Sequence, residues 1–391
     1  MKKRWLTAIG TVVLAVAVVV SSVSGAQSTP PASIKQAHAP GEIIVKFKPG
    51  IVDKVVTALH NTLGSELLSR NTKLGFDVVR VDEKLLPEVL KEYRNNPLVE
   101  FAEPNYYVHA YWTPDDSNYT EQWSLPQIDA PKAWDVTRSS KDVSIAIVDT
   151  GVDYRHPDLD DKVEKGYDYI EDDWDPMDEN GHGTHCAGVA AAETNNHAGV
   201  AGMAPNASIY AVPVLDQNGS GKLSDVAEGI MQAADHGSQV ISLSLGASSG
   251  SSTLKNAVNY AWDKGSVVVA AAGNNGSSDP SYPAYYEKAI AVGATDENND
   301  KASFSNYGSW VDIAAPGTDI TSTYLNGKYK SESGTSMAAP HVAGVAALLA
   351  AQGRDNDEIR KAIESTSDTT VAGTGVYWSH GLLNAEDAVR Y

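Results

Sequence analysis

Five runs of apolar, largely β-branched residues constrain the fold of this 391-residue chain more than any other feature. A strand with one face in water alternates polar and apolar residues, whereas these runs are apolar almost throughout and are separated by helical segments rich in small residues. This pattern predicts an α/β fold, with a doubly wound parallel sheet that is covered by helices on both faces. The runs are 143–148, 208–215, 240–245, 267–271 and 289–292.

The carboxyl ends of these strands are the expected place for a functional site, since open parallel sheets bind ligands in the crevice beyond those ends. Asp149 directly follows the first run, and Asn274 follows the fourth run after one alanine and one glycine. Burying a carboxylate at the end of an apolar strand is costly unless it has partners. Asp149 and Asn274 are therefore the first candidate site residues.

Three separated motifs carry an aspartate, a histidine and a serine, in that order. Asp149 lies in the motif Ser-Ile-Ala-Ile-Val-Asp-Thr-Gly, His182 in Asn-Gly-His-Gly-Thr-His-Cys-Ala-Gly, and Ser336 in Ser-Gly-Thr-Ser-Met-Ala-Ala-Pro-His-Val-Ala-Gly. A serine hydroxyl is a weak nucleophile at neutral pH. Acyl transfer therefore needs an imidazole to take its proton and a carboxylate to hold that imidazole in the right tautomer.

In these motifs and in their order the chain resembles the subtilisin-like serine proteases, and within them the calcium-dependent, thermitase-like branch. The resemblance covers nearly all of residues 112–391. It implies a serine endopeptidase that forms an acyl-enzyme intermediate, with Ser336 as nucleophile, His182 as general base and Asp149 as the group that orients the imidazole. It also implies that Asn274 and the Ser336 backbone N–H stabilise the oxyanion.

The same resemblance implies two backbone rims that pair with an extended substrate and therefore accept many sequences. The matched pocket positions hold no acidic cluster that would select a basic residue before the scissile bond. Residues 270–273 and Ser281 are expected to line a roomy, largely apolar pocket. The expected rim residues are Ser244, Leu245, Gly246, Gly219 and Gly221.

Two other functions are compatible with parts of the sequence. His182, His185 and Cys186 have the helical spacing i, i+3 and i+4, which would suit a zinc-dependent peptidase, although the segment lacks the Glu of an H-E-x-x-H site. An inactive homologue that binds peptides without cleaving them would keep the fold, but the complete set of catalytic residues argues against it.

Structural calcium is the implied cofactor, at two or three sites, since carboxylate and carbonyl oxygens suit this ion. The resemblance places one site in the acidic loop 168–177, a second beside the start of the protease domain and a third near the end of a strand. An alternative explanation of these acidic residues is a solubilising surface. The expected ligands are Asp168, Glu171, Asp173, Asp175 and Met177; Asp116, Asp158, Glu193, Asn196, Ala198 and Val200; and Asp312, Ala284, Tyr286 and Ala289.

The first 26 residues read as a secretory signal peptide. They contain Lys2-Lys3-Arg4, the apolar run 12–20 and small residues at 24–26. The apolar run is too short to cross a bilayer comfortably, so we expect a secreted, extracellular protein with no membrane anchor. Because Cys186 is the only cysteine, an intrachain disulfide is impossible, and bound metal is the expected source of extra stability.

Residues 27–111 are expected to form a small ferredoxin-like α+β propeptide after a linker at 27–40. The pattern predicts strands at 42–48, 76–81 and 99–104, and helices at 52–63 and 85–93. Its place between signal and protease resembles that of the subtilisin propeptides, which assist folding and inhibit the enzyme. We expect self-cleavage near Tyr111.

The remaining residues, 112–391, form the predicted peptidase domain and contain 17 basic against 40 acidic residues, a net charge of −23. Such a surface repels nucleic acid and anionic membranes. The expected partners are therefore protein and peptide substrates and the chain's own propeptide, and the mature enzyme is expected to be a monomer.

Overall fold

The computed structural model describes residues 38–108 and 112–391, which belong to two compact units, Met1–Val108 and His109–Tyr391. The predicted signal peptide and the predicted cleavage point near Tyr111 lie outside the described residues. Within the described part of the chain, no helix is both long and apolar enough to cross a membrane.

The first unit has the predicted ferredoxin-like arrangement, with an antiparallel sheet in the order β2-β3-β1-β4. Strand β2 was not predicted, because most of its side chains are exposed and it shows no alternation of polar and apolar residues. The elements are β1 (His38–Phe47), α1 (Asp53–Thr62), β2 (Glu66–Asn71), β3 (Phe76–Arg80), η1 (Glu83–Leu85), α2 (Leu86–Asn95) and β4 (Val99–Tyr106).

The second unit is built on an eight-stranded sheet whose paired strands are all parallel, which confirms the predicted α/β class. The five predicted runs form its centre, and three short strands that were not predicted extend its edges. In spatial order the strands are β14 (Gly381–Leu382), β11 (Ile313–Pro316), β10 (Ala289–Thr295), β9 (Val267–Ala271), β8 (Val240–Leu243), β5 (Ser144–Asp149), β7 (Ser208–Pro213) and β6 (Val163–Lys165). A separate hairpin pairs β12 (Ile320–Tyr324) with β13 (Lys328–Glu332).

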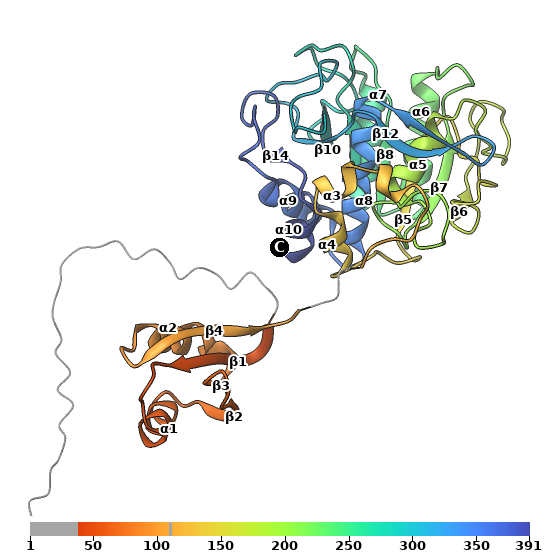
Figure 1. The fold of residues 1–391 in the computed structure, drawn as a ribbon. Coiled ribbons are helices and arrows are strands. Elements are labelled where there is room, and N and C mark those ends of the chain that lie inside the picture. Colours follow the sequence, from red (N-terminus) through yellow and green to blue (C-terminus); the bar gives the residue numbers. More distant parts are fainter. Residues whose placement is uncertain (1–37, 109–111) are drawn as a thin grey trace, which may run out of the picture. The chain divides into compact units, whose positions relative to one another are not determined.

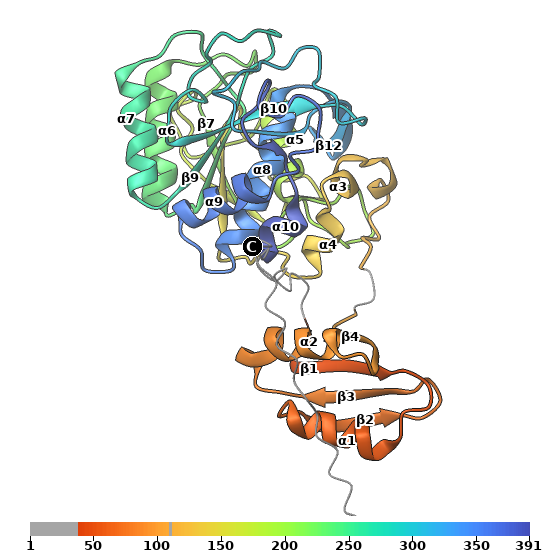
Figure 2. The same cartoon turned by 90° about the vertical axis from the view of Figure 1, so that its left-hand side faces the viewer.

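Helices cover both faces of this sheet, as Figures 1 and 2 show for α6 and α7 on one side and α8 on the other. Ile145 and Ile147 of β5 belong to the core with α5 and α8, whereas Ala146 and Val148 belong to the core with α6 and α7. The helices are η2 (Tyr119–Glu121), α3 (Ser124–Gln127), α4 (Ala130–Trp134), α5 (His182–Ala191), α6 (Leu223–His236), α7 (Ser252–Asp263), α8 (Thr335–Ala350), α9 (Asn356–Thr366) and α10 (Ala385–Arg390).

Small residues let α5 and α8 approach closely, and these helices carry the predicted base and nucleophile at their amino ends. A Cβ atom on Gly344 of α8 would lie 2.4 Å from the Met203 Cβ and 3.0 Å from the Ala190 carbonyl oxygen of α5. A real Cβ atom essentially never has a contact as short as 2.4 Å, and a contact of 3.0 Å is already unusually tight. Only glycine at position 344 therefore allows this packing, which brings His182 and Ser336 toward one cleft.

Candidate active site

Asp149 and His182 meet where strand β5 ends and helix α5 begins. The Nδ1 atom of His182 lies 2.7 Å from Oδ1 of Asp149, a short, charge-assisted hydrogen bond. Asp149 is 1% exposed and has no ion pair with a Lys or Arg of the described residues. Its carboxylate therefore acts almost entirely on the imidazole, and on the Thr150 amide, which donates to Oδ1 at 2.7 Å.

Gly183 allows this close meeting of strand and helix. A Cβ atom at this position would lie 2.1 Å from the Gly151 carbonyl oxygen and 3.2 Å from the Asp149 Cβ. Any larger residue would therefore push the start of α5 away from β5 and lengthen the Asp149–His182 hydrogen bond.

A second buried carboxylate, Asp178, joins the same two elements and was not singled out from the sequence. Its Oδ1 accepts from the Thr150 hydroxyl at 2.9 Å and from the amides of Asn180 and Gly181, and its Oδ2 accepts from the amide and hydroxyl of Thr184. Burial raises the pKa of Asp178, and its hydrogen bonds oppose that increase. Asp178 thus links Thr150, the residue that follows strand β5, to the first turn of the helix that carries His182.

The charge around His182 favours its protonated form. Burial is the largest single influence and lowers the pKa of His182, but the charge and hydrogen bond of Asp149, with weaker contributions from Glu332 and Asp178, together raise this pKa to about 9. The imidazolium that forms when His182 accepts a proton is therefore well stabilised.

Ser336 lies in the first turn of α8 and is half-buried. Its Oγ donates to the Ser244 carbonyl oxygen at 3.2 Å, and no hydrogen bond joins it to His182 in the described structure. The Ser336 carbonyl oxygen accepts from the Ser244 hydroxyl at 2.8 Å and from the Cys186 thiol at 3.4 Å. Ser336 is thus held between β8 and α5, as a nucleophile at this cleft requires.

Asn274 is oriented so that its amide nitrogen is free. Its Oδ1 accepts from the Thr335 amide at 2.8 Å and from the Thr335 hydroxyl at 3.0 Å. With the oxygen anchored, the Nδ2 group remains as a donor beside Gly334 and Ser336, which suits stabilisation of an oxyanion.

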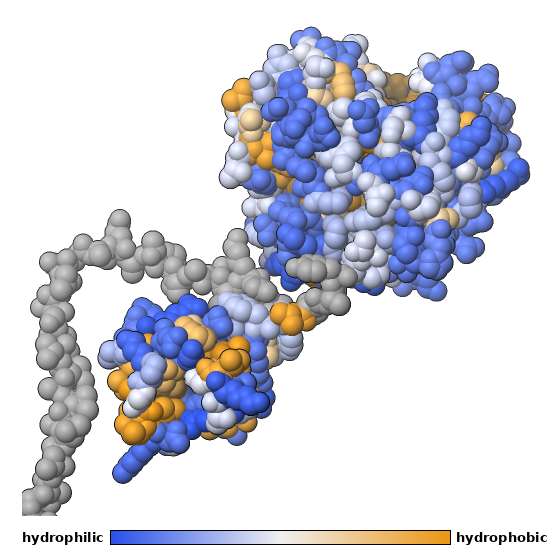
Figure 3. Space-filling model, viewed as in Figure 1, coloured by the Kyte–Doolittle hydropathy of each residue, from blue (hydrophilic) through white to orange (hydrophobic). Residues whose placement is uncertain are grey.

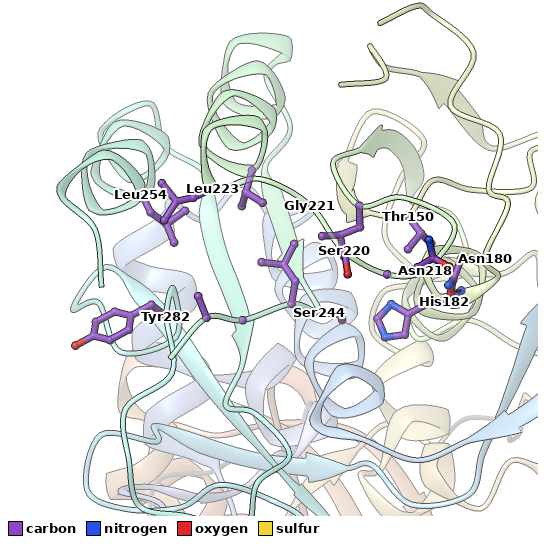
Figure 4. Close-up of a pocket in the computed structure, with 16 residues that line it drawn as sticks. Thr150, Asn180, His182, Asn218, Ser220, Gly221, Leu223, Ser244, Leu254 and Tyr282 are labelled. Atoms are coloured by element: carbon purple, nitrogen blue, oxygen red, sulfur yellow. Dashed lines mark hydrogen bonds between the residues drawn. The ribbon is translucent and has the colours of Figure 1, made fainter. Parts of the chain in front are cut away.

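Two cavities of about 600 and 640 Å³ adjoin along the segment 244–247, which lines both. His182 and the predicted rim residues Gly219 and Gly221 line the first, while Ser336 and Asn274 line the second. Figure 4 shows His182 at one end of the first cavity and an apolar group at the other. That apolar group consists of Leu223, Leu254 and Tyr282, together with Leu215 and Val226, none of which was predicted, and the predicted rim residue Leu245.

The three side chains of the alternative zinc site do not converge on one point in the described structure. His185 is fully buried, and its Nε2 atom lies 2.9 and 3.0 Å from the carbonyl oxygens of Ile320 and Lys330. Burial, the largest influence, lowers the pKa of His185 to about 4, which suits a neutral structural residue. Cys186 does approach His182 and Asp149, but its thiol donates to Ser336, and burial raises its pKa well above the usual value.

Asp116 and Asp158 form a pair of buried carboxylates that suits a cation. They are 5% and 0% exposed, and neither has an ion pair with a described Lys or Arg. Burial, and the charge of Asp158 to a smaller degree, raise the pKa of Asp116.

The loop that contributes the other predicted ligands folds over this pair. Asn195 donates its amide to Asp116, and Val200 donates its amide to Asp158 at 2.8 Å. The Asn196 side chain also donates to Asp158, at 2.8 Å, and accepts from the Ala198 amide. One carboxylate oxygen of Glu193 accepts from the Asp161 amide, and this carboxylate lies close to those of Asp160 and Asp161, a group that could hold a metal ion.

The acidic loop 168–177 surrounds a cavity of about 280 Å³, which all five predicted ligands line: Asp168, Glu171, Asp173, Asp175 and Met177. Asp175 already accepts from the Tyr154 hydroxyl and from Lys165, so its carbonyl oxygen is the better metal donor. Glu179 and Asp216 also line the cavity and were not predicted.

At the third predicted site, a protein cation meets Asp312. The Arg360 guanidinium lies 3.2 Å from Oδ1 of Asp312 and donates to the carbonyl oxygens of Glu287 and Ala289. Two expected ligands thus face a positive charge from α9, while Ala284 and Tyr286 are buried in the adjacent core. Asp312 also lies with Glu364 and His380 in a group whose side-chain atoms are close enough to hold a metal ion, so the third site stays a prediction.

Comparison with known proteins agrees with this geometry. The Subtilase family (Peptidase_S8) matches residues 140–381, and the fervidolysin N-terminal prodomain family matches residues 24–105. The thermophilic serine proteinase of Bacillus sp. (strain AK1) is 55% identical over 91% of this chain and 89% of its own length. Thermitase of Thermoactinomyces vulgaris is 59% identical over 72% of this chain and all of its own length. Among solved structures, a protease of Pseudoalteromonas arctica PAMC 21717 matches with a TM-score of 0.66 and 34% identity, over 71% of this chain and 99% of the other.

Proposed function

Because the chain belongs to the subtilase family and is a subtilisin-like serine protease with an N-terminal prodomain, we propose that Asp149, His182 and Ser336 are its catalytic triad. The observation that carries this assignment is the 2.7 Å hydrogen bond between His182 and Asp149, at a cleft that Ser336 and Asn274 also line.

The proposed reaction proceeds in two acyl transfers. The Ser336 hydroxyl leaves the Ser244 carbonyl and gives its proton to Nε2 of His182, while its oxygen bonds to the substrate carbonyl carbon. The C–N bond then breaks as His182 returns the proton to the departing amine. Water, deprotonated by His182, cleaves the acyl-enzyme ester and frees Ser336.

Two groups are proposed to stabilise the charge that develops in this reaction. Asn274 Nδ2 and the Ser336 amide would donate to the oxyanion, because fixed donors in a water-poor site need no reorganisation as the charge forms. Asp149 would stabilise the imidazolium, in keeping with the raised pKa of His182.

Broad specificity toward peptide and protein substrates follows from the shape of the cleft. The rim residues Ser244, Leu245 and Gly246, with Gly219 and Gly221 opposite, would bind the substrate main chain, which is common to all sequences. The apolar end of the first cavity would take a large side chain some residues before the scissile bond.

Calcium would serve stability rather than chemistry. The buried pair Asp116 and Asp158 and the acidic loop 168–177 fit such an ion, because their carboxylates lack enough basic partners to balance their charge. When bound, calcium supplies positive charge that links distant segments of the chain.

The first unit is proposed to act as a propeptide that is removed by the enzyme itself during secretion. Of the large apolar side chains that are exposed, many belong to this unit although it is small, including Leu67, Leu68 and Phe101. The face of residues 112–391 in Figure 3 is, by contrast, largely hydrophilic. An apolar surface of this kind favours association with a folding partner.

The decisive test is Ser336→Ala in the full-length precursor. We expect no peptidase activity and no cleavage near Tyr111, and we expect wild type to lose activity with a serine-directed phosphonylating reagent but not with a zinc-selective chelator. Maturation of purified Ser336→Ala at the normal rate would disprove self-cleavage. Inhibition by the zinc chelator alone would disprove the triad.

A further inference from the structure

The second cavity differs from the largely apolar pocket that the sequence predicts, because a carboxylate lines it. Asp279 is the only ionisable residue among those that line the cavity, which also includes Ser336, Asn274 and Ala271. This cavity adjoins the nucleophile directly. On the proposed function, it receives the side chain of the residue whose main-chain carbonyl carbon Ser336 attacks.

The carboxylate of Asp279 is held in place but not neutralised. The Ser277 hydroxyl accepts from the Asp279 amide at 3.0 Å and donates to its Oδ2 at 2.8 Å. Oδ1 accepts no hydrogen bond from the described residues, and none of their Lys or Arg side chains forms an ion pair with Asp279. One oxygen therefore remains available to a ligand.

The segment that carries Asp279 is held by hydrogen bonds of the residues just before it and by the backbone pairing of Tyr282 with Ala247 just after it, so the carboxylate does not depend on a free loop for its position. Asn306 accepts from the amides of Asn275 and Ser277, and the Trp310 indole donates to the Ser278 carbonyl at 3.1 Å. A fixed negative charge at a cavity wall attracts a cation more strongly than the same charge on a mobile chain, since less side-chain entropy is lost on binding.

We propose that Asp279 selects substrates with lysine or arginine immediately before the scissile bond. The cavity of about 640 Å³ has room for these long side chains, and its lining, although mostly polar, includes Leu245, Ala271 and Pro280, which can contact their methylene groups. This inference rests on the proposed function, because it assigns the same cavity to the residue that is acylated. The enzyme would still accept large uncharged residues, but at a lower rate than basic ones.

The test uses pairs of peptides that differ in charge and hardly in shape: arginine against citrulline, and lysine against norleucine. For wild type we expect kcat/KM to be about three- to tenfold higher for the charged member of each pair. This is the gain expected from an ion pair with Asp279 that stays partly accessible to solvent. Raising the salt concentration should shrink this ratio, since the carboxylate is exposed.

Asp279→Asn should bring both ratios close to one, while Asp279→Glu should keep the preference. Asp387→Asn removes the same charge from an exposed position in α10 and should leave the ratios as in wild type. The inference is wrong if wild type does not distinguish the pairs, or if Asp279→Asn keeps the preference. Absence of all cleavage, with no active sites titrated by a phosphonate, would instead refute the proposed function.

Discussion

Each of the two units contains a histidine that is hydrogen-bonded to an aspartate, yet only one pair is suited to catalysis. In the first unit His60 Nε2 lies 3.0 Å from Oδ2 of Asp77, and in the second His182 Nδ1 lies 2.7 Å from Oδ1 of Asp149. Both aspartates are buried. The difference lies in what surrounds each pair.

The pair in the first unit is saturated. Arg70 donates to both oxygens of Asp77, at 2.6 and 2.7 Å, and the second ring nitrogen of His60 lies 2.7 Å from the Tyr93 hydroxyl. Burial, the largest influence, raises the pKa of Asp77, but Arg70 and His60 outweigh it and lower that pKa. Every group of this network has a partner, so it stabilises the core of the unit.

The pair in the second unit is left incomplete. Oδ2 of Asp149 is buried without a hydrogen-bond partner in the described structure, no described Arg or Lys neutralises the carboxylate, and the imidazole lines an open cavity. An unneutralised carboxylate behind an accessible imidazole favours proton uptake. The comparison indicates that the pair suited to act as a general base is the one whose remaining hydrogen-bonding groups lack partners.

The largest expected effect comes from changing the aspartate of each pair to asparagine. Asp149→Asn should lower kcat by about 10⁴-fold, the loss typical of triads whose carboxylate no longer fixes the imidazole tautomer. Asp77→Asn should leave kcat unchanged in enzyme that has matured, because its unit is removed. The measurement is kcat per active site titrated with a phosphonate. Equal losses in the two variants would contradict the comparison.

Stability should show the reverse pattern. In a precursor that also carries Ser336→Ala, Asp77→Ala leaves Arg70 and His60 without their shared partner, and breaking such a buried pair costs about 3 to 5 kcal/mol. A unit of this size has a total stability of the same order, so we expect it to unfold. Hydrogen exchange of residues 38–108 measures this.

The matched control is Glu100→Ala. It breaks the exposed Lys46–Glu100 pair, which should cost less than about 1 kcal/mol. If residues 38–108 were equally protected from hydrogen exchange in both variants, the buried network would have no special role in stabilising the unit.

Much of this molecule could be predicted from local sequence patterns. Apolar runs identify the central strands of the large sheet because both faces of those strands are buried, and the motifs around His182 and Ser336 identify the helices that carry them. Strand β2 and edge strand β6 were missed because edge strands are short and partly exposed, so their sequences carry little periodic signal.

The site residues that were missed depend on contacts between distant segments. Arg360 reaches Asp312 across 48 positions, and nothing in the local sequence of either residue announces the pair. Asp178 forms hydrogen bonds only because a strand end and a helix start fold beside it. Asp279 lines a cavity made from segments that are far apart in the chain.

Calcium should affect the stability of the second unit alone, because every predicted calcium ligand lies in residues 112–391. A ligand that binds only the folded state stabilises it by RT ln(1 + [L]/Kd), or about 2.7 kcal/mol at a hundredfold excess over Kd. Chelation should therefore lower the melting temperature of the mature enzyme and leave hydrogen exchange in residues 38–108 of the precursor unchanged.

Asp116→Asn and Asp158→Asn should each reduce this calcium-dependent stabilisation strongly, whereas Asp387→Asn should not. Differential scanning calorimetry with and without chelator measures the difference. If chelation leaves the melting temperature and the autolysis rate of wild type unchanged, the calcium sites do not exist.

The smallest expected effect concerns the charge that surrounds His182 beyond its own aspartate. With a pKa of about 9, His182 is mostly protonated at neutral pH, so kcat/KM should rise with pH and level off above that value. Glu332 at the end of β13 contributes to the raised pKa of His182, whereas the exposed Asp387 of α10 does not. Glu332→Gln should move the midpoint of the profile to lower pH by less than about one unit, and Asp387→Asn should not move it.

The titration of His182 should lower the free energy of unfolding as pH rises, whereas it raises kcat/KM. The folded-state pKa of His182 lies above its ordinary value of 6.5, so its contribution to stability is complete below pH 6.5 and is lost as pH rises through about 9. Activity should thus increase over the range in which this stabilisation disappears, and urea unfolding of Ser336→Ala protein across that range measures the loss. The contradicting outcome is a free energy of unfolding that does not change with pH, together with an activity profile whose midpoint lies near pH 7. It would mean that Asp149 raises the pKa of His182 no more than a solvated carboxylate does. The contrast with the saturated pair in the first unit would then lose its electrostatic basis.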